Sequence, residues 1–266
     1  MGSGALWLIG AGNMGGAMVR GWLSSAGWDR PVTVIDPFVP SVPEGVTLLR
    51  AIPAGSAQPD ILVLAVKPQQ LGDVRAIFAD KAGAPRLLLS ILAGVETATL
   101  RDAFSADATV RAMPNLPVSI GEGVTALYSS DAEAAARAEA AALVAPLGLV
   151  EWIGDEALFD AVTALSGCGP GFLFRFIEAM AQAGEALGLP ADQALRLATA
   201  TVKGSGLLAA QSDESPAVLA DRVASPGGST REGLNVLDDG DALKLLLRAT
   251  LAAAAKRNAE LAAAAR

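Results

Sequence analysis

The feature that most constrains how this chain folds is a glycine-rich turn directly after a short apolar run near its first residue. The run covers residues 5–9 and ends at Gly-Ala-Gly-Asn-Met-Gly, residues 10–15, and a helix-compatible segment follows to about residue 26. This order predicts a buried parallel strand, a tight turn and a helix start, with glycines spaced as a dinucleotide pyrophosphate requires. A purely structural glycine turn is the alternative, since such turns are common.

The residues of this turn have separate expected roles. Gly10 permits the tight turn, Gly12 lets the backbone approach the phosphates, and Gly15 lets the helix pack closely on the strand. The helix N-terminus offers unpaired N–H groups and a partial positive charge to an anion. We therefore expect the cofactor-binding residues to include those of this segment: Gly10, Gly12, Asn13, Met14 and Gly15.

A second apolar run, residues 31–35, ends at Asp36, which lies 21 residues after Gly15. An acidic side chain at about this distance accepts hydrogen bonds from the adenosine ribose of a bound dinucleotide. The structural alternative is a strand-terminal aspartate before Pro37, a common turn arrangement. Residues 37–49 contain no lysine or arginine to hold a 2′-phosphate. Because a carboxylate repels that phosphate, the sequence favours NADH over NADPH.

Later apolar runs predict the remaining strands of the sheet. They cover residues 60–66, 87–91, 109–113, 124–128 and 149–153, and an alanine-rich helix is expected at about residues 132–144. Ligands of open α/β sheets bind beyond the carboxyl ends of the strands. The strand exits therefore supply further candidate cofactor contacts, namely Ala65, Val66, Lys67, Pro68, Ala93, Gly94 and Asn115. For Asn115, which two prolines flank, a rigid turn without a ligand is an equally good interpretation.

Long helical patterns replace the β-rich runs from about Asp155 onward. They cover residues 172–187, 191–210 and 241–265. We therefore expect an α/β domain over residues 1–154 and an all-helical domain over residues 155–266. Alanine and leucine on several helix faces indicate burial against a second copy of the chain, although internal packing explains much of the same pattern.

Two glycine-rich turns interrupt the helical half. Residues 166–170 read Ser-Gly-Cys-Gly-Pro, and residues 225–230 read Ser-Pro-Gly-Gly-Ser-Thr, each directly before a predicted helix. Backbone N–H groups and hydroxyls in such turns can surround a small anion such as a carboxylate. Ordinary helix capping by serine and threonine explains the same residues equally well.

The chain contains no histidine and one cysteine, Cys168. The missing imidazole excludes dehydrogenases that use histidine as acid or base, Ser-His and Cys-His catalysis, and histidine-ligated metals, and we expect no metal site. A single cysteine excludes an intramolecular disulfide and suits a reducing, cytoplasmic location.

Charge and hydropathy narrow the expected partners. The net charge of −8 argues against nucleic acid, because phosphate backbones require clustered lysine and arginine. No uncharged apolar run reaches the roughly 18 residues that a membrane span needs, and no basic region precedes the first apolar run as in a signal peptide. We expect a globular protein that binds a small molecule and neither nucleic acid nor a membrane.

Together the turns resemble those of the Δ1-pyrroline-5-carboxylate reductases, the enzymes of the last step of proline synthesis. The matching motifs occur in that family's order along essentially the whole chain, and they are IGAGNMG (residues 9–15), AVKP (65–68), RAMPNLP (111–117), SGCGP (166–170) and SPGGST (225–230). The resemblance implies a Rossmann-type dinucleotide-binding domain followed by a helical dimerisation domain, with the active site completed at the interface of a homodimer or of a higher oligomer built from such dimers.

The resemblance also implies roles for single residues. Residues 225–230 would surround the substrate carboxylate and ring nitrogen, while residues 65–68, 93–94 and Asn115 would line the nicotinamide side. The substrate-binding residues are then Ser225, Gly227, Gly228, Ser229, Thr230 and Ser166. Thr230 is the expected catalytic residue, because a cyclic imine can enter already protonated and needs only a hydroxyl that orients its nitrogen or relays a proton.

Three departures from the family pattern concern the substrate pocket and the cofactor. Cys168 replaces a common serine, Gly171 and Phe172 replace Ala-Tyr, and Asp36 stands where NADPH-preferring members carry Ser, Thr, Asn or Arg. Two other functions stay open. One is a reductase of a related cyclic imine or an enzyme like the β-hydroxyacid dehydrogenases, whose catalytic lysine has its mid-domain candidates in Lys203 and Lys244. The other is a non-catalytic NAD(H)-binding protein.

Overall fold

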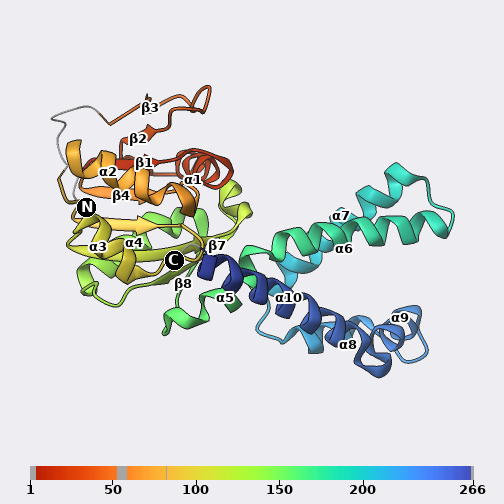
Figure 1. Cartoon of the computed structure of the whole chain (residues 1–266). Helices are drawn as coiled ribbons and strands as arrows, with labels where there is room; N and C mark the ends of the chain where they lie inside the picture. The colour runs from red at the N-terminus through yellow and green to blue at the C-terminus, as the bar shows by residue number, and fades with distance from the viewer. Residues whose placement is uncertain (1–3, 53–58, 82, 265–266) are drawn as a thin grey trace. The chain divides into compact units, whose positions relative to one another are not determined.

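The computed structural model describes residues 4–52, 59–81 and 83–264, without the side chains of residues 79–81 and 264 (Figure 1). The chain divides into two compact units. The first contains the residues up to Cys168 together with those from Ala254 onward, and the second is Gly169–Ala253. The boundary that the sequence suggests near Asp155 stays a prediction, and residues 156–168 belong to the first unit in the structure.

The described part of the first unit contains an eight-stranded sheet in the order β3-β2-β1-β4-β5-β6-β7-β8 (Figure 1). Its strands are β1 Leu6–Ile9, β2 Val32–Ile35, β3 Val46–Leu49, β4 Ile61–Leu64, β5 Leu87–Ser90, β6 Ala108–Pro114, β7 Gly123–Tyr128 and β8 Gly148–Trp152. Neighbouring strands are parallel except β6 and β7, which are antiparallel. The strand order changes direction at β1, which is where ligands of doubly wound folds bind. The predicted α/β fold is therefore confirmed.

The strand β3 is not predicted by the sequence pattern. It is a four-residue edge strand, and none of its side chains is fully buried. It therefore lacks the continuous apolar run that marks the central strands of a parallel sheet. Its last residue, Leu49, pairs with Ile35, the last residue of β2. That register brings Arg50 next to Asp36.

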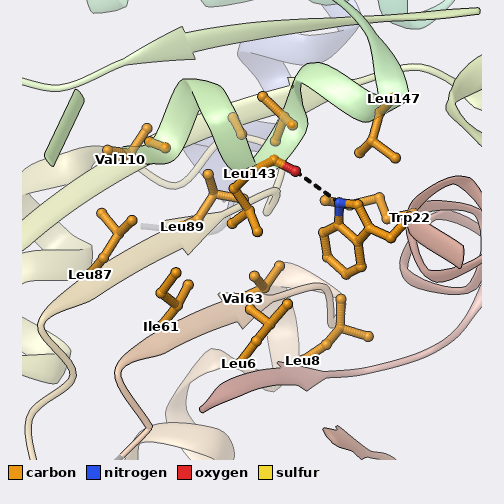
Figure 2. Close-up of a cluster of buried hydrophobic side chains, with 14 of the residues drawn as sticks. Leu6, Leu8, Trp22, Ile61, Val63, Leu87, Leu89, Val110, Leu143 and Leu147 are labelled. Carbon is orange, nitrogen blue, oxygen red and sulfur yellow. Dashed lines mark hydrogen bonds between the residues drawn. The ribbon is translucent and has the colours of Figure 1, made fainter. Parts of the chain in front are cut away.

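Helices cover both faces of the sheet. One face packs on α1 (Asn13–Ser24) and α4 (Ala134–Val144), and the other on α2 (Leu71–Lys81) and α3 (Thr97–Phe104). On the first face the Trp22 indole Nε1 donates to the Leu143 carbonyl at 2.9 Å, and Figure 2 shows this bond above the strand side chains. Both residues are nearly or fully buried, so the bond satisfies a polar group that burial would otherwise penalise. It ties α1 to α4 and fixes α1 on the sheet.

The remaining described elements are helical. They are short turns at Glu156–Leu158 and Phe159–Val162 (α5), a π-helical turn at Thr163–Gly167, and α6 Gly169–Ala186, α7 Ala191–Gln211, α8 Pro216–Val223, α9 Ser229–Asp238 and α10 Ala242–Ala264. The glycine-rich turn expected at residues 166–170 is thus largely helical. Pro170 is the second residue of α6, where its missing N–H costs no intrahelical bond.

The second unit buries few apolar side chains within itself. Its core lies between α6 and α7 and consists of small residues, Ala181, Ala194 and Ala198. Many large apolar side chains are exposed, among them Leu173, Phe174, Phe176, Leu208, Leu246 and Val236. Large apolar side chains exposed in this number indicate an interaction site rather than a solvated face. By length and composition alone, the helical stretch Glu156–Ala186 could also span a bilayer, a test that helices of soluble proteins pass too.

Candidate active site

Three loops meet at the carboxyl edge of the sheet. Ile9 pairs with Leu64, and Leu64 pairs with Ser90, so β1, β4 and β5 end at the same level. Gly10, Ala65 and the turn at residues 91–96 leave the sheet side by side. The structure therefore brings together candidates from three separate motifs, in the place where a parallel sheet binds its ligand.

The glycine turn has the geometry that its sequence predicts. Gly10 has a φ of +92°, and a Cβ built on it would lie 2.7 Å from the Ala65 carbonyl oxygen. Gly15 begins the packing of α1 on the strands, and its Cβ would lie 2.2 Å from the Gly10 carbonyl oxygen. Neither position accepts a side chain without a shift of backbone.

Gly12 differs from Gly10 and Gly15, because no neighbouring residue in the described structure would clash with a Cβ at this position. Apart from the adjacent residues of the chain, no described atom lies within 4 Å of a Cβ built there. Gly12 is also the N-cap of α1, and no side chain of the described residues caps that helix. Asn13 and Met14 are the first two residues of α1. Open space thus lies in front of unpaired helix N–H groups, which is the arrangement that binds phosphates.

Asp36 holds the glycine turn to the end of β2. Its Oδ2 accepts a 2.7 Å hydrogen bond from the Ala11 N–H, and its Oδ1 accepts from the N–H groups of Phe38 at 2.8 Å and Val39 at 3.0 Å. The residue is 8% exposed. Burial by itself raises the pKa of this carboxyl, but the three N–H donors and the Arg50 charge outweigh it and hold the pKa below its ordinary value. Asp36 therefore has a structural role in addition to the expected ribose contact.

Asp36→Asn should lower the free energy of unfolding by about 1–3 kcal/mol at neutral pH, because the amide nitrogen cannot accept the Ala11 N–H. The pKa of Asp36 is lower in the folded chain than its ordinary value of 3.8. The stabilisation is therefore complete above the unfolded pKa and is lost as the pH falls through the folded pKa. Urea unfolding of both proteins from neutral to acidic pH measures this difference. The difference in unfolding free energy between the two proteins should become smaller only at acidic pH. A difference that grows at acidic pH would contradict the lowered pKa of Asp36.

Arg50 places a cation beside Asp36, at the adenosine end of the site, and no local sequence pattern predicts it there. Its Nη1 donates to the Asp36 carbonyl at 3.3 Å and to the Val39 carbonyl, and its Nη2 donates to the Pro40 carbonyl at 3.2 Å. Arg50 directly follows residues 37–49, which contain no lysine or arginine. Recognition of β3 as a neighbour of β2 would have found Arg50.

The loop after β4 leaves one of its candidate residues, Lys67, exposed. The Lys67 N–H donates to the Gln70 side chain at 3.1 Å, while Pro68 starts a short helical turn. Ala65 and Val66 are half-buried beside the glycine turn. The Ala65 carbonyl and the Val66 side chain lie directly beside Gly10.

Asn115 joins two motifs that lie far apart in the sequence. Its Nδ2 donates to the Ser166 carbonyl at 3.1 Å, and its Oδ1 accepts from the Val124 N–H at 2.8 Å. The Ser166 hydroxyl donates to the Val162 carbonyl at 2.9 Å. The Asn115 side chain therefore holds the π-helical turn to the sheet, and the Ser166 hydroxyl is engaged within the helical segment. Their expected ligand contacts remain predictions.

The second unit contains the other glycine-rich turn. Gly227 has a φ of +69°, and the Gly228 N–H donates to the Ser225 carbonyl at 2.9 Å. Gly228 is the N-cap of α9 and has no side chain to cap it, while Ser229 and Thr230 are the first two residues of the helix. Ser225, Ser229 and Thr230 are exposed within this unit. Free N–H groups and three hydroxyls therefore surround one helix N-terminus, as binding of a small anion requires.

The two lysines considered for a dehydrogenase-like mechanism lie elsewhere in the second unit. Lys203 is an exposed residue of α7. Lys244 is in the first turn of α10, and its Nζ pairs with the Asp241 carboxylate at 2.7 Å. Neither lysine belongs to the turn at residues 225–230, which carries the hydroxyls of Ser225, Ser229 and Thr230.

Comparison with known proteins covers both units. The family described as pyrroline-5-carboxylate reductase dimerisation matches residues 156–261, and the family described as NADP oxidoreductase, coenzyme F420-dependent, matches residues 6–94. A pyrroline-5-carboxylate reductase of Pseudomonas aeruginosa is 34% identical over 96% of this chain and 95% of its own length.

Solved structures give the same picture. A pyrroline-5-carboxylate reductase from Coxiella burnetii has a TM-score of 0.85 and 31% identity, covering 98% of this chain and 99% of that chain. The enzyme from Plasmodium falciparum, solved with NADP bound, has a TM-score of 0.80 and 27% identity, covering 97% and 98% of the two chains. The similarity therefore does not stop at the nucleotide-binding unit.

Proposed function

This chain belongs to the pyrroline-5-carboxylate reductase family, and we propose from that premise that it reduces Δ1-pyrroline-5-carboxylate to proline with a nicotinamide cofactor. It is an oxidoreductase that acts on a carbon–nitrogen double bond, in the last step of proline biosynthesis. The observation that carries this proposal is the match to such enzymes over nearly the full length of both chains.

The first unit fits a dinucleotide. Gly12 leaves space in front of the uncapped start of α1, and the close contact at Gly15 keeps that helix end near β1. Residues 10–15 would hold the pyrophosphate, Asp36 the adenosine ribose, and the exits of β4 and β5 the nicotinamide side. When bound, the nicotinamide supplies a hydride to the imine carbon.

The substrate acid fits the start of α9. The N–H groups of residues 229–231 have no intrahelical partner by their position, and the helix dipole favours a carboxylate there. The Thr230 hydroxyl lies in the same first turn and would orient the ring nitrogen. A protonated imine becomes a neutral amine when the hydride arrives, so no strong acid is needed. This mechanism agrees with a chain that has no histidine.

Self-association completes the proposed site. The helical region matches a family described by its dimerisation, and its exposed apolar side chains need a covering surface. We infer a homodimer in which the helices of the second unit pack on those of a second copy. We also infer a cytoplasmic enzyme that has no nucleic-acid partner and no membrane partner.

An assay of the purified protein tests the reaction. We expect NADH or NADPH to be oxidised with pyrroline-5-carboxylate, and proline to be the product. Small 2-hydroxy acids with NAD⁺ or NADP⁺ should give no comparable rate. If the hydroxy acids are oxidised and the imine is not reduced, the chain is a dehydrogenase-like enzyme. If cofactor binds and neither reaction occurs, the chain is a nucleotide-binding protein.

Cofactor choice depends on two opposed side chains. The Asp36 carboxylate repels a 2′-phosphate, whereas the Arg50 guanidinium next to it attracts one. We infer that NADH is favoured and that Arg50 retains some use of NADPH. Asp36→Ser should raise the ratio of kcat/KM for NADPH to that for NADH by about tenfold, and Arg50→Gln should lower it by about tenfold.

Steady-state kinetics with both cofactors measure this ratio. Both residues also hold the backbone near β2, but a purely structural loss weakens NADH and NADPH together and leaves the ratio unchanged. A wild-type enzyme that strongly prefers NADPH would refute the Asp36 interpretation. A ratio that Arg50→Gln does not move would remove Arg50 from 2′-phosphate recognition.

A further inference from the structure

A charged cluster of the buried Arg111 and the half-buried Glu156 lies beside the turn between β5 and α3. The Glu156 Oε1 accepts from the Thr97 N–H at 2.9 Å and from the Arg111 Nη1 at 3.1 Å, and its Oε2 accepts from the Thr97 hydroxyl at 2.9 Å. Thr97 is 2% exposed and Arg111 is 5% exposed. Three donors on one carboxylate define its position closely.

Glu156 caps a helix that it does not belong to. Thr97 is the first residue of α3, and the Glu96 side chain at the N-cap makes no capping hydrogen bond. The carboxylate that satisfies this helix start comes from 59 residues further along the chain. A negative charge at a helix N-terminus is favourable, and a neighbouring arginine neutralises it here. Glu156 therefore fixes the end of the turn at residues 91–96.

Arg111 fixes the beginning of the same turn. It lies on β6, where its partner across the ladder is Ser90, the last residue of β5. Its guanidinium carbon lies 4.3 Å from the centre of the Phe159 ring. The Arg111 Nε has no hydrogen-bond partner within the described part of the chain, so Glu156 is the acceptor that the structure gives this guanidinium. A buried arginine with one acceptor is sensitive to the loss of that acceptor.

The middle of the turn is held by the last helix. Gly94 has a φ of +73°, and a Cβ built on it would lie 2.8 Å from the Ala262 Cα and 2.9 Å from its Cβ. Ala262 lies in the part of α10 that belongs to the first unit. The turn is thus fixed at its start, middle and end by residues that come later in the chain.

From this arrangement we infer that Glu156, held by Arg111, is a positioning residue for the nicotinamide half of the cofactor. The inference rests on the proposed function, in which Ala93 and Gly94 line the nicotinamide. Glu156 acts through Thr97 and the turn, and the Arg111 charge balances its own. Glu156 therefore affects the position of the nicotinamide ring rather than the electric field at that ring. Adenosine binding, at the exits of β1 and β2, should not depend on it.

The test compares the whole cofactor with a fragment that lacks the nicotinamide. Dissociation constants are measured for NADH and ADP-ribose, and for NADPH and 2′-phospho-ADP-ribose. In Glu156→Ala the affinity for the whole cofactor should fall about tenfold and the fragment affinity should change by less than about twofold, because misplacement affects the ring only. The kcat for the imine should fall at least as far as the cofactor affinity, with little change in the KM of the imine.

Smaller changes keep the test decisive if Glu156→Ala folds poorly. Thr97→Val removes one hydrogen bond and keeps the side-chain shape, so it should also lower the ratio of cofactor affinity to fragment affinity. Thr97→Ser keeps the hydroxyl and should restore the wild-type ratio. The control is Asp60→Asn, which breaks the Asp60–Arg86 pair at the amino end of the strands. It should lower the thermal midpoint and leave the ratio of the two affinities unchanged.

The outcomes separate the two proposals. If Glu156→Ala and Thr97→Val fold and leave the affinity ratio unchanged, the positioning role is wrong. It is also wrong if fragment binding falls in parallel with cofactor binding. If the wild-type protein reduces no imine, the proposed function fails, but the affinity ratio still reports on the turn.

Discussion

Gly15→Ala is expected to destabilise the first unit by about 3 kcal/mol and to weaken cofactor binding by about 100-fold, because the new methyl group overlaps a backbone carbonyl. The added Cβ would lie 2.2 Å from the Gly10 oxygen and 3.1 Å from the Ala65 Cβ. A backbone oxygen cannot rotate away as a flexible side chain does. Either α1 moves off the sheet or the turn deforms, and both changes displace the phosphate-binding N–H groups.

Thermal unfolding and titration with NADH or NADPH measure the two effects of Gly15→Ala. Two matched glycine variants serve as controls. Gly12→Ala adds a methyl group where, apart from the adjacent residues of the chain, no described atom lies within 4 Å, so it should keep the fold and lose cofactor affinity. Gly72→Ala adds one on α2 with equally open space, so it should keep both. A Gly15→Ala protein with wild-type stability would show that α1 does not pack on the turn as described.

Thr230→Val is expected to lower turnover of the imine by about 100-fold, because the variant loses the hydroxyl that orients the ring nitrogen or relays its proton. Thr230 is exposed in the first turn of α9 and supports no core, so the fold should be kept. Cofactor affinity should be unchanged, since the glycine turn at residues 10–15 belongs to the other unit.

Steady-state kinetics and cofactor titration separate these effects of Thr230→Val. Thr230→Ser retains a hydroxyl and should recover most of the turnover. Thr199→Val is the control, because it removes an exposed hydroxyl on α7 that donates to the Leu195 carbonyl of its own helix. Unchanged turnover in Thr230→Val would exclude Thr230 from the mechanism and leave the α9 backbone as the substrate-binding element.

The sequence predicted the parts of the fold that depend on local pattern. The continuous apolar runs of β1, β4 and β5 are readable because both faces of those strands are buried. The change to helical spacing after β8 predicts the helices of the second unit. The edge strand β3 gives no such signal. The sequence pattern predicts a glycine turn at residues 166–170, where the structure has the end of a π-helical turn and the start of α6.

The candidate site was predictable where one segment supplies both the geometry and the chemistry. The glycine turn is such a segment, since three glycines and one helix start lie within residues 10–15. Arg50 was not predictable, because its place beside Asp36 follows from the pairing of β2 with β3. Asn115 was expected to face the cofactor, and the structure shows that its amide also bonds to Ser166 and Val124.

By itself the sequence determined an α/β nucleotide-binding unit, a helical half and the family to which both belong, because spacing and residue type along one segment carry that information. Only the tertiary structure placed Arg50 at Asp36, Glu156 at the start of α3 and Ala262 against Gly94. Each of these contacts joins segments that are far apart along the chain, or on different strands. Their meeting depends on how the whole sheet and its helices pack, and no local pattern records it.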